Sequence, residues 1–501
     1  MNNPSPPLIQ AMLREDFYSH PVDKIRLLQT HASWVLLTGP FAYKVKKPVN
    51  FGFLDFSTLE KRQHFCEEEL RLNLRLAPDL YLDVLSISQE DRDFKLGGMQ
   101  DICEYCVKMR QFNDADLLSE RINTKTFDRA WMDILARNIA DFHACAAQSP
   151  AINAFGAPCY LLSHIDASLN TALHHPEAIN PESIHDLRRL CMQQTKLHAE
   201  GFEKRMRDKR IRDCHGDLHL GNIALYQDKP TVFDCIEFNP EYRAIDTLND
   251  AAFLVMDCDA RGHTDLAFRF LSRYLEFSGD YDGMPLLPLF LSYRAGVRGK
   301  VACLLAEDKA IEAPEKQHKL TEAARYFDLA ASYLNDASSP SLYAVGGLSG
   351  SGKSRLAQLG CGPARAVIIR SDATRKRIAA EHADLDLYGK AMNRLTYRTI
   401  FDAATSVLKA GWPVILDATF LSAEERQRAR DIAKDAGVPF HFAWIDAPEE
   451  KLREHIQGRM QKGTNISDAD LRVLDMQLAH YHVPDEPDIH ILPSADAWPW
   501  Q

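Results

Sequence analysis

The chain lacks an excess of positive charge. Its 501 residues include 59 lysines and arginines against 70 aspartates and glutamates, so the formal net charge is −11 at pH 7. Broad, non-specific binding to nucleic acid or to an anionic membrane depends on many basic side chains. The composition therefore argues against a general binder of either kind, although a local basic groove remains compatible with it.

Long apolar runs are also missing. No stretch approaches the roughly 20 consecutive apolar residues that a membrane-spanning helix needs. The first ten residues lack the basic-then-apolar order of a signal peptide. Apolar residues make up 46% of the chain and charged residues 26%, which is typical of soluble globular proteins. We therefore expect a cytoplasmic protein without membrane partners, and the length predicts two to four domains.

The eleven cysteines do not form a disulfide or zinc-binding pattern. The close pair Cys103 and Cys106 lies in a strand-like run, and no second Cys-x-x-Cys follows it. We interpret the pair as structural. Free thiols in this number suit a reducing cytoplasm.

The sequence pattern changes once along the chain. Residues 1–110 mix strand-like and helix-like stretches, including a predicted hairpin over 33–46 around a Thr-Gly-Pro turn. Residues 111–336 are mostly helical, with a short β-rich interruption at 214–238. A polar segment at 337–341 is the best linker, and strands alternate with helices over 342–501. Such alternation predicts a parallel sheet covered by helices on both faces.

The first phosphoryl-transfer signature lies in the β-rich interruption. It reads Cys-His-Gly-Asp-Leu-His-Leu-Gly-Asn over 214–222, followed by Val-Phe-Asp over 232–234. Kinase chemistry needs a carboxylate beside the attacking hydroxyl and oxygen ligands for magnesium. At this spacing Asp217 can accept the substrate's proton, Asn222 can reach the metal, and Asp234 supplies the stronger metal ligand.

These residues resemble the aminoglycoside phosphotransferase and choline kinase branch of the protein-kinase-like fold, over roughly residues 20 to 335. The resemblance implies a bilobal fold in which Asp217 is the catalytic base, Asn222 and Asp234 hold Mg²⁺, and His215 orders the loop. It also implies an ATP clamp, made by a lysine on the third strand and a glutamate on the following helix.

Lys44 is the best clamp lysine, with Lys46 second on the same strand face, and Glu69 is the best partner. The alternative is that Lys44, Lys46 and Lys47 form a solvated basic strand and the glutamate run a solvated helix face. One departure from the kinase pattern is that no Gly-x-Gly-x-x-Gly precedes the lysine. We interpret this absence as a trait of the branch.

The second signature is a P-loop, Gly-x-x-x-x-Gly-Lys-Ser, between a strand-like run and a helical stretch. Backbone N–H groups of such a turn hold phosphates, Lys353 reaches the β- and γ-oxygens, and Ser354 can bind magnesium. Asp417, at the end of a later strand, is the natural second magnesium ligand. The predicted nucleotide-binding residues are Gly347, Ser349, Gly350, Ser351, Gly352, Lys353 and Ser354.

Asp372 follows the second strand of this region, and Arg375 comes three residues later. The pair faces the crevice in which α/β folds bind ligands. It resembles small P-loop kinases such as polynucleotide kinase, gluconate kinase, chloramphenicol phosphotransferase and the zeta toxins. The resemblance implies that Asp372 is a second general base and that Arg375 holds the substrate. Both residues favour a kinase over a mechanical ATPase.

A small arginine-bearing lid is also expected from this resemblance. Arg453 and Arg459 fit its position and would stabilise the transferring phosphoryl group. His455 stands where such kinases commonly carry another arginine. The alternative for each arginine is an ordinary solvated helix.

The sequence thus predicts an α/β and α+β multidomain protein, with a bilobal protein-kinase-like part followed by a P-loop domain. We interpret it as a bifunctional, ATP- and Mg²⁺-dependent phosphotransferase acting on hydroxyl groups of small molecules. Two alternatives stay open. One half is a nucleotide-sensing regulator of the other, or the P-loop half is a nucleic-acid 5′-hydroxyl kinase, which the acidic charge does not favour. Pockets in both folds vary, so the motifs indicate the reaction rather than the acceptor.

Overall fold

The computed structural model describes residues 6–52, 54–90, 93–308, 311–335, 340–380, 382, 384–462, 470–479 and 482–500. Most of the predicted linker at 337–341 therefore lies outside the described residues. The chain forms two compact units. The first comprises Met1–Trp131, Cys145–Phe155 and Ile211–Asp246, and the second comprises Met132–Ala144, Gly156–Arg210 and Thr247–Gln501.

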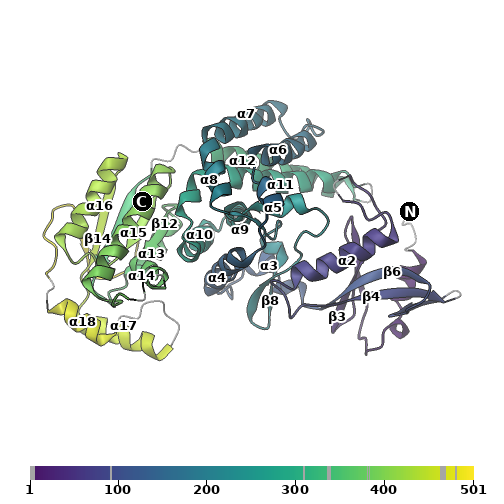
Figure 1. Cartoon of the computed structure of the whole chain (residues 1–501), viewed down its shortest axis with the longest axis horizontal. Coiled ribbons are helices and arrows are strands. Elements are labelled where there is room, and N and C mark those ends of the chain that lie inside the picture. The colour runs from purple at the N-terminus through teal and green to yellow at the C-terminus, as the bar shows by residue number, and fades with distance from the viewer. Residues whose placement is uncertain are drawn as a thin grey trace. The chain divides into compact units, whose positions relative to one another are not determined.

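An antiparallel sheet with one long helix forms the N-terminal part of the first unit. Among the described residues its strand order is β1-β2-β3-β6-β4-β5. The predicted hairpin is present as β2 and β3, and Gly39 makes its turn at φ +99°. Helix α2 packs on β4 and β6 (Figure 1). The elements are α1 (Pro7–Met12), β1 (Arg26–Gln29), β2 (Ser33–Leu37), β3 (Phe41–Lys46), α2 (Leu59–Asn73), β4 (Tyr81–Glu90), β5 (Asp93–Leu96) and β6 (Ile102–Arg110).

A capping residue starts helix α2, and the spacing of its buried residues determines which face of the helix packs on the sheet. Thr58 caps it by accepting a hydrogen bond from the Lys61 N–H. Its buried positions recur every three or four residues, and they include charged as well as apolar side chains. The inner face therefore carries a carboxylate, Glu69, toward β3.

The first signature lies on two small antiparallel pairs in the first unit. Strand β7 pairs with β10, and β8 pairs with β9. We call the run from the end of β7 to the start of β8, which contains Asp217 and Asn222, the signature segment. The elements are α3 (Leu118–Arg121), α5 (Pro150–Ala154), β7 (Ile211–Asp213), β8 (Ile223–Tyr226), β9 (Lys229–Val232) and β10 (Ala244–Asp246).

Helices make up the first part of the second unit, and we call them the helical region. Helix α9 is buried along nearly its whole length because α10 and α11 both pack on it. Across the described residues no helix is long and apolar enough to cross a membrane. The helices are α4 (Ala130–Cys145), α6 (Pro158–Ala172), α7 (Pro181–Leu197), α8 (Ala199–Arg207), α9 (Thr247–Ala260), α10 (Thr264–Ser278), α11 (Leu287–Ala306) and α12 (Ala313–Asn335).

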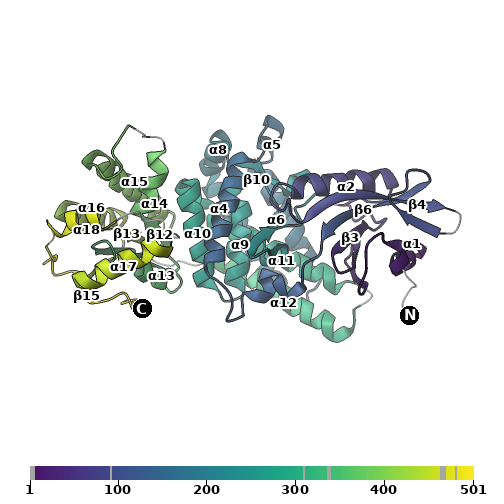
Figure 2. The same cartoon turned by 90° about the horizontal axis from the view of Figure 1, so that it is seen from below.

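The rest of the second unit is a parallel sheet in the order β12-β13-β11-β14-β15, as far as the described residues show. Helices alternate with its strands along the chain (Figure 2). Their bounds are β11 (Leu342–Gly347), α13 (Lys353–Cys361), β12 (Val367–Arg370), α14 (Ser371–Ala379), α15 (Lys390–Lys409), β13 (Val414–Asp417), α16 (Ala423–Ala436), β14 (Phe440–Ile445), α17 (Glu449–Lys462), α18 (Leu471–Leu478) and β15 (Ile489–Leu492).

The predicted fold class is confirmed. An antiparallel sheet with helix α2 and the short β segments of the first signature lie in the first unit, and the second unit combines the helical region with a parallel sheet and its flanking helices. The strands expected to alternate with helices after residue 341 are present, and a capping box starts α16 at Ser422 and Glu425.

Candidate active sites

Two lysines of β3 meet one glutamate of α2 inside the first unit. Lys44 Nζ lies 2.8 Å from Glu69 Oε1, and Lys46 Nζ lies 2.7 Å from Glu69 Oε2. Lys44 Nζ also lies 2.7 Å from Asp234 Oδ1. Glu69 is fully buried and Lys46 is 1% exposed, so neither belongs to a solvated strand or helix face. Lys44 and Lys46 alternate with Val45 along β3, and this period of two turns both toward α2.

The buried charges hold one another ionised. Burial by itself would lower the pKa of Lys44, but the carboxylates of Asp234 and Glu69 raise it well above its ordinary value. Burial would raise the pKa of Glu69, yet Lys44 and Lys46 lower it to about 2. A buried charge is tolerated when opposite charges contact it in this way.

Glu237 completes this cluster and was not anticipated from the sequence. It is buried and contacts Lys46 Nζ, three residues after Asp234. Burial raises its pKa, which the nearby Lys46 opposes. The only available signal was a glutamate in the segment after a predicted metal ligand. We call Lys44, Lys46, Glu69 and Glu237 the lysine–glutamate cluster.

The signature segment brings Asp217 and Asn222 together. Asn222 Nδ2 donates to Asp217 Oδ2 at 2.9 Å and to the Asp217 carbonyl at 3.0 Å. His215 Nε2 lies 3.0 Å from the Phe233 carbonyl, while its Nδ1 lies 3.3 Å from the Asp217 N–H. These partners indicate a neutral ring protonated at Nε2. His215 thus connects the backbone before Asp234 to the backbone of Asp217.

Backbone shape keeps the two acidic side chains accessible. Gly216 has φ +88°, and an added Cβ would come within 2.8 Å of the Tyr242 carbonyl oxygen. Asp234 has φ +62°, a left-handed conformation that few non-glycine residues adopt. The side chain of Asp217 is 34% exposed and that of Asp234 is 41% exposed. Both carboxylates can therefore meet a bound reactant.

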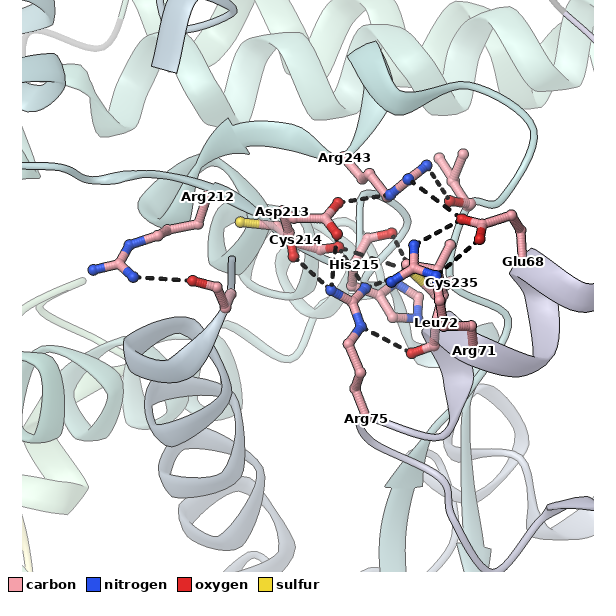
Figure 3. A network of polar contacts seen from close by, with 12 residues as sticks. Glu68, Arg71, Leu72, Arg75, Arg212, Asp213, Cys214, His215, Cys235 and Arg243 are labelled. Atoms are coloured by element: carbon pink, nitrogen blue, oxygen red, sulfur yellow. Dashed lines mark hydrogen bonds and ion pairs between the residues drawn. The ribbon is translucent and has the colours of Figure 1, made fainter. Parts of the chain in front are cut away.

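Arginine side chains anchor the strand that precedes this segment (Figure 3). Arg75 donates to the Asp213 carbonyl at 2.8 Å and to the Cys214 carbonyl at 3.2 Å. Arg243 Nε donates to Asp213 Oδ1 at 2.6 Å. Because Arg243 is buried, this contact supports a structural ion pair rather than a substrate-facing role. The sequence did not indicate Arg75 or Asp213, which have no motif of their own.

Asp217, Asn222 and Asp234 each carry a carboxylate or amide oxygen. Carboxylate and amide oxygens are the ligands that Mg²⁺ prefers. The donor type at these three residues therefore fits magnesium bound to nucleotide phosphates. We call Lys44, Glu69, Asp217, Asn222 and Asp234 the N-terminal site.

The P-loop opens into a cavity of about 1090 Å³. Its lining includes Lys353 and Ser354 at the start of α13, Asp372 at the start of α14, and Asp417 at the end of β13. These side chains meet because the carboxyl ends of parallel strands share one edge of the sheet. We call Lys353, Ser354, Asp372, Arg375 and Asp417 the P-loop site.

Ser354 and Asp417 are in direct contact. Ser354 Oγ donates to Asp417 Oδ2 at 2.6 Å. Burial raises the pKa of Asp417, while Lys353 and the hydrogen bond from Ser354 lower it, and Asp372 adds a further increase. A hydroxyl and a carboxylate placed together suit a magnesium ion.

A row of polar side chains continues from Asp372 along the cavity wall. Arg375 Nη1 donates to Asp372 Oδ1 at 3.3 Å, and Arg375 Nη2 donates to Asn393 Oδ1 at 3.2 Å. Asn393 Nδ2 then donates to Glu425 Oε1 at 3.2 Å. The sequence did not indicate Asn393 or Glu425, which lie on helices without a phosphate motif. The row offers alternating donors and acceptors next to the P-loop.

The predicted lid residues take different places. Arg453 pairs with Glu449 and Asp475, and it is not among the described residues that line the cavity. Arg459 lies in α17, and its side chain is outside the described part of the structure. His455 does line the cavity, and its Nδ1 lies 2.8 Å from the Gly350 carbonyl. The lid roles of both arginines stay predictions.

Gly350 has no room for a side chain, so its replacement should disturb the P-loop. It has φ +87°, and an added Cβ would come within 2.6 Å of the Leu452 carbonyl oxygen. Gly411 has a similar φ of +83°, but nothing lies within 4 Å of its added Cβ. We expect Gly350→Ala to raise the KM for ATP at the P-loop site at least tenfold, corresponding to a strain of about 1–3 kcal/mol. Gly411→Ala should leave KM unchanged in steady-state assays, and an equal rise in both variants would contradict the clash.

Comparison with known proteins gives a family match for the C-terminal part and a relative for nearly the whole chain. The family model AAA_33, described as an AAA domain, matches residues 342–484. The region that contains the P-loop site is therefore similar to this family.

Two solved structures are similar to parts of the chain. A gluconokinase from Sinorhizobium meliloti 1021 is 20% identical, over 32% of this chain and 85% of its own, with a TM-score of 0.26. An ethanolamine kinase from Plasmodium vivax is 12% identical, over 62% of this chain and 84% of its own, with a TM-score of 0.37.

One relative that extends over nearly the whole chain is the uncharacterized protein Rv2004c of Mycobacterium tuberculosis (strain ATCC 25618 / H37Rv). It is 32% identical over 467 residues, which cover 90% of this chain and 91% of that protein. At this identity and coverage, the chain belongs to the same family as Rv2004c.

Proposed function

We propose that the chain is a bifunctional phosphotransferase, in which each site transfers the γ-phosphate of ATP to a hydroxyl group of a small molecule. The observation that carries the proposal is the P-loop cavity, because phosphate-binding, metal-binding and proton-accepting side chains line the same space. The N-terminal site supports a second activity, because it also has candidate phosphate-binding, metal-binding and proton-accepting side chains, which lie on different strands and helices from those of the P-loop site.

At the P-loop site, Asp372 accepts the proton of the acceptor hydroxyl while the hydroxyl oxygen forms a bond to the γ-phosphorus. The bond between that phosphorus and the β–γ bridging oxygen breaks, and ADP leaves with the electron pair. Lys353 and the P-loop N–H groups hold the phosphates. Arg375 orients Asp372 through the contact between them.

At the N-terminal site the same bonds form and break, with Asp217 as the proton acceptor. Lys44 is held by Glu69 and Asp234 at a point where it would contact nucleotide phosphates. Asn222 and Asp234 would hold Mg²⁺ here, and Ser354 and Asp417 would hold it at the P-loop site; the bound ion would neutralise phosphate charge. His215 and Asn222 keep the carboxylate of Asp217 in position.

A screen for phosphorylated products tests the proposal. The full chain is incubated with Mg²⁺, ATP and pooled metabolite fractions, and a 5′-hydroxyl oligonucleotide is run beside them. We expect new small-molecule phosphates by mass spectrometry. Lys353→Ala should remove the products of the P-loop site, since the lysine that binds the β- and γ-phosphates is gone.

Other results would redirect or end the proposal. Phosphorylation of the oligonucleotide that is lost in Lys353→Ala would favour the nucleic-acid kinase. If nucleotide titration shows that both sites bind ATP but one of them forms no product, a regulatory role for that half would be favoured. Absence of any phosphoryl transfer or ATP turnover under all conditions would refute the phosphotransferase assignment.

A further inference from the structure

An arginine at the end of β12 lies against the wall of the P-loop cavity. Arg370 is the last residue of the strand and comes two positions before Asp372. Its side chain is 9% exposed, and it lines the cavity beside Ser354 and Asp417. In the sheet register Arg370 is level with Asp417. The conformation at Arg370 therefore bears directly on where the Asp372 carboxylate stands.

The partner of Arg370 comes from the helical region, 94 positions earlier in the chain. Arg370 Nε donates to Glu276 Oε2 at 2.9 Å, and Arg370 Nη2 makes a second contact with Glu276 Oε1. Arg273 Nη1 donates to the same Glu276 Oε2 at 2.9 Å. Burial raises the pKa of Glu276, and the Arg273 guanidinium beside it opposes this rise.

Helix α10 approaches the strand at several points, within the second unit. The Ile368 N–H donates to Ser272 Oγ at 2.9 Å, which gives a partner to this edge strand's backbone. Arg377 of α14 lies over Gly279, where an added Cβ would come within 2.8 Å of Arg377 Nη1. Both views show α10 beside β12 and α13 (Figures 1 and 2).

Stability does not account for the Glu276–Arg370 pair. A buried ion pair costs desolvation, and apolar residues of the same volume often serve stability as well or better. A two-point contact between guanidinium and carboxylate does fix geometry, because both groups are planar. The pair fixes the end of β12, where the chain turns into α14 and presents Asp372.

We infer that Glu276 is a positioning residue for the P-loop site, which the helical region supplies to hold Arg370 and, through it, the Asp372 segment. This inference rests on the proposed function of that site. The P-loop domain then has a complete site only in the presence of helix α10, so the two parts of the chain are coupled through this contact.

A second ion pair, between helix α9 of the helical region and the segment that precedes β12, provides a control. Arg365 Nη2 lies 2.8 Å from Asp259 Oδ2, and Asp259 is in the helical region. Arg365 precedes β12, so this pair lies at the amino end of the strand, opposite the end that carries Asp372. If both pairs were purely structural, breaking either one should have the same effect on kcat. If Glu276 positions the site, only the Glu276 variant should lower kcat.

The test uses the full chain carrying Asp217→Asn, so that turnover of Mg-ATP with water as acceptor reports the P-loop site. We expect Glu276→Gln to lower kcat about a hundredfold, the effect of roughly 1 Å of misplacement, with KM for ATP changed less than threefold. Glu276→Asp should restore part of kcat, and Asp259→Asn should retain the parent value.

The outcomes separate the inference from the function on which it rests. If Asp372→Asn leaves turnover unchanged, the function proposed for the site is wrong. If Asp372→Asn abolishes turnover but Glu276→Gln keeps kcat within twofold, or Asp259→Asn lowers it equally, the inference is wrong. Should Glu276→Gln fail to fold, Glu276→Met with Arg370→Met removes the charges while keeping the volume. A folded double variant with parent kcat would also overturn the inference.

Discussion

Replacing Asp217 with asparagine should lower phosphoryl transfer at the N-terminal site at least a hundredfold and leave the P-loop site unaffected. Asparagine has nearly the same shape but does not accept the acceptor's proton, and a positioned general base contributes about 10²- to 10⁴-fold. Asp372→Asn should give the opposite pattern. The measurement is the rate of formation of each phosphorylated product, or of ADP, for the two variants and the double variant.

Asp228→Asn is a control for the first of these changes. Asp228 lies in the exposed turn between β8 and β9, in the same β-rich region (214–238) as Asp217, and has φ +60°. Asparagine tolerates this left-handed conformation, so folding and rate should not change. The proposal of two independent bases fails if either single variant lowers both activities equally. It also fails if the double variant keeps the wild-type rate.

Glu69→Gln should cost the N-terminal sheet about 3–5 kcal/mol of stability. Removing one partner of a buried ion pair is strongly destabilising. Without the Glu69 carboxylate, Lys44 would rely on Asp234 and the almost fully buried Lys46 on Glu237. The measurement is hydrogen-exchange protection of amides in β3 and α2, which reports local opening within a multidomain chain. Glu67→Gln, at an exposed position on the same helix, should change protection by less than about 0.5 kcal/mol.

The effect of Glu69→Gln should depend on pH in one direction. The pKa of Glu69 is lowered to about 2 in the folded chain. Its contribution is therefore complete above the unfolded value of about 4.3 and is lost as pH falls through the folded value. The stability gap between wild type and Glu69→Gln should narrow as pH drops from 5 toward 2. A gap that stays constant over this range would show that Glu69 acts through packing rather than charge.

The local pattern of the chain was sufficient for most of its elements. The hairpin over 33–46, the P-loop between β11 and α13, and the strands of the parallel sheet all follow from signals within a few residues. Alternation of period two also placed Lys44 and Lys46 on one strand face. These features depend on backbone preference and short-range spacing, which a sequence displays directly.

Pairing between distant residues required the tertiary structure. The sequence offered Lys44 and Lys46 as alternatives, and the structure uses both on Glu69, with Glu237 as a further carboxylate. Nothing near Arg370 indicated that Glu276 would hold it.

The two phosphate-binding signatures and the candidate bases Asp217 and Asp372 were thus determined by sequence alone. The surroundings that hold these groups were decided by folding. The physical reason is that a buried charge is stable only when an opposite charge packs against it. That partner is selected by the arrangement of helices and strands, not by its distance along the chain.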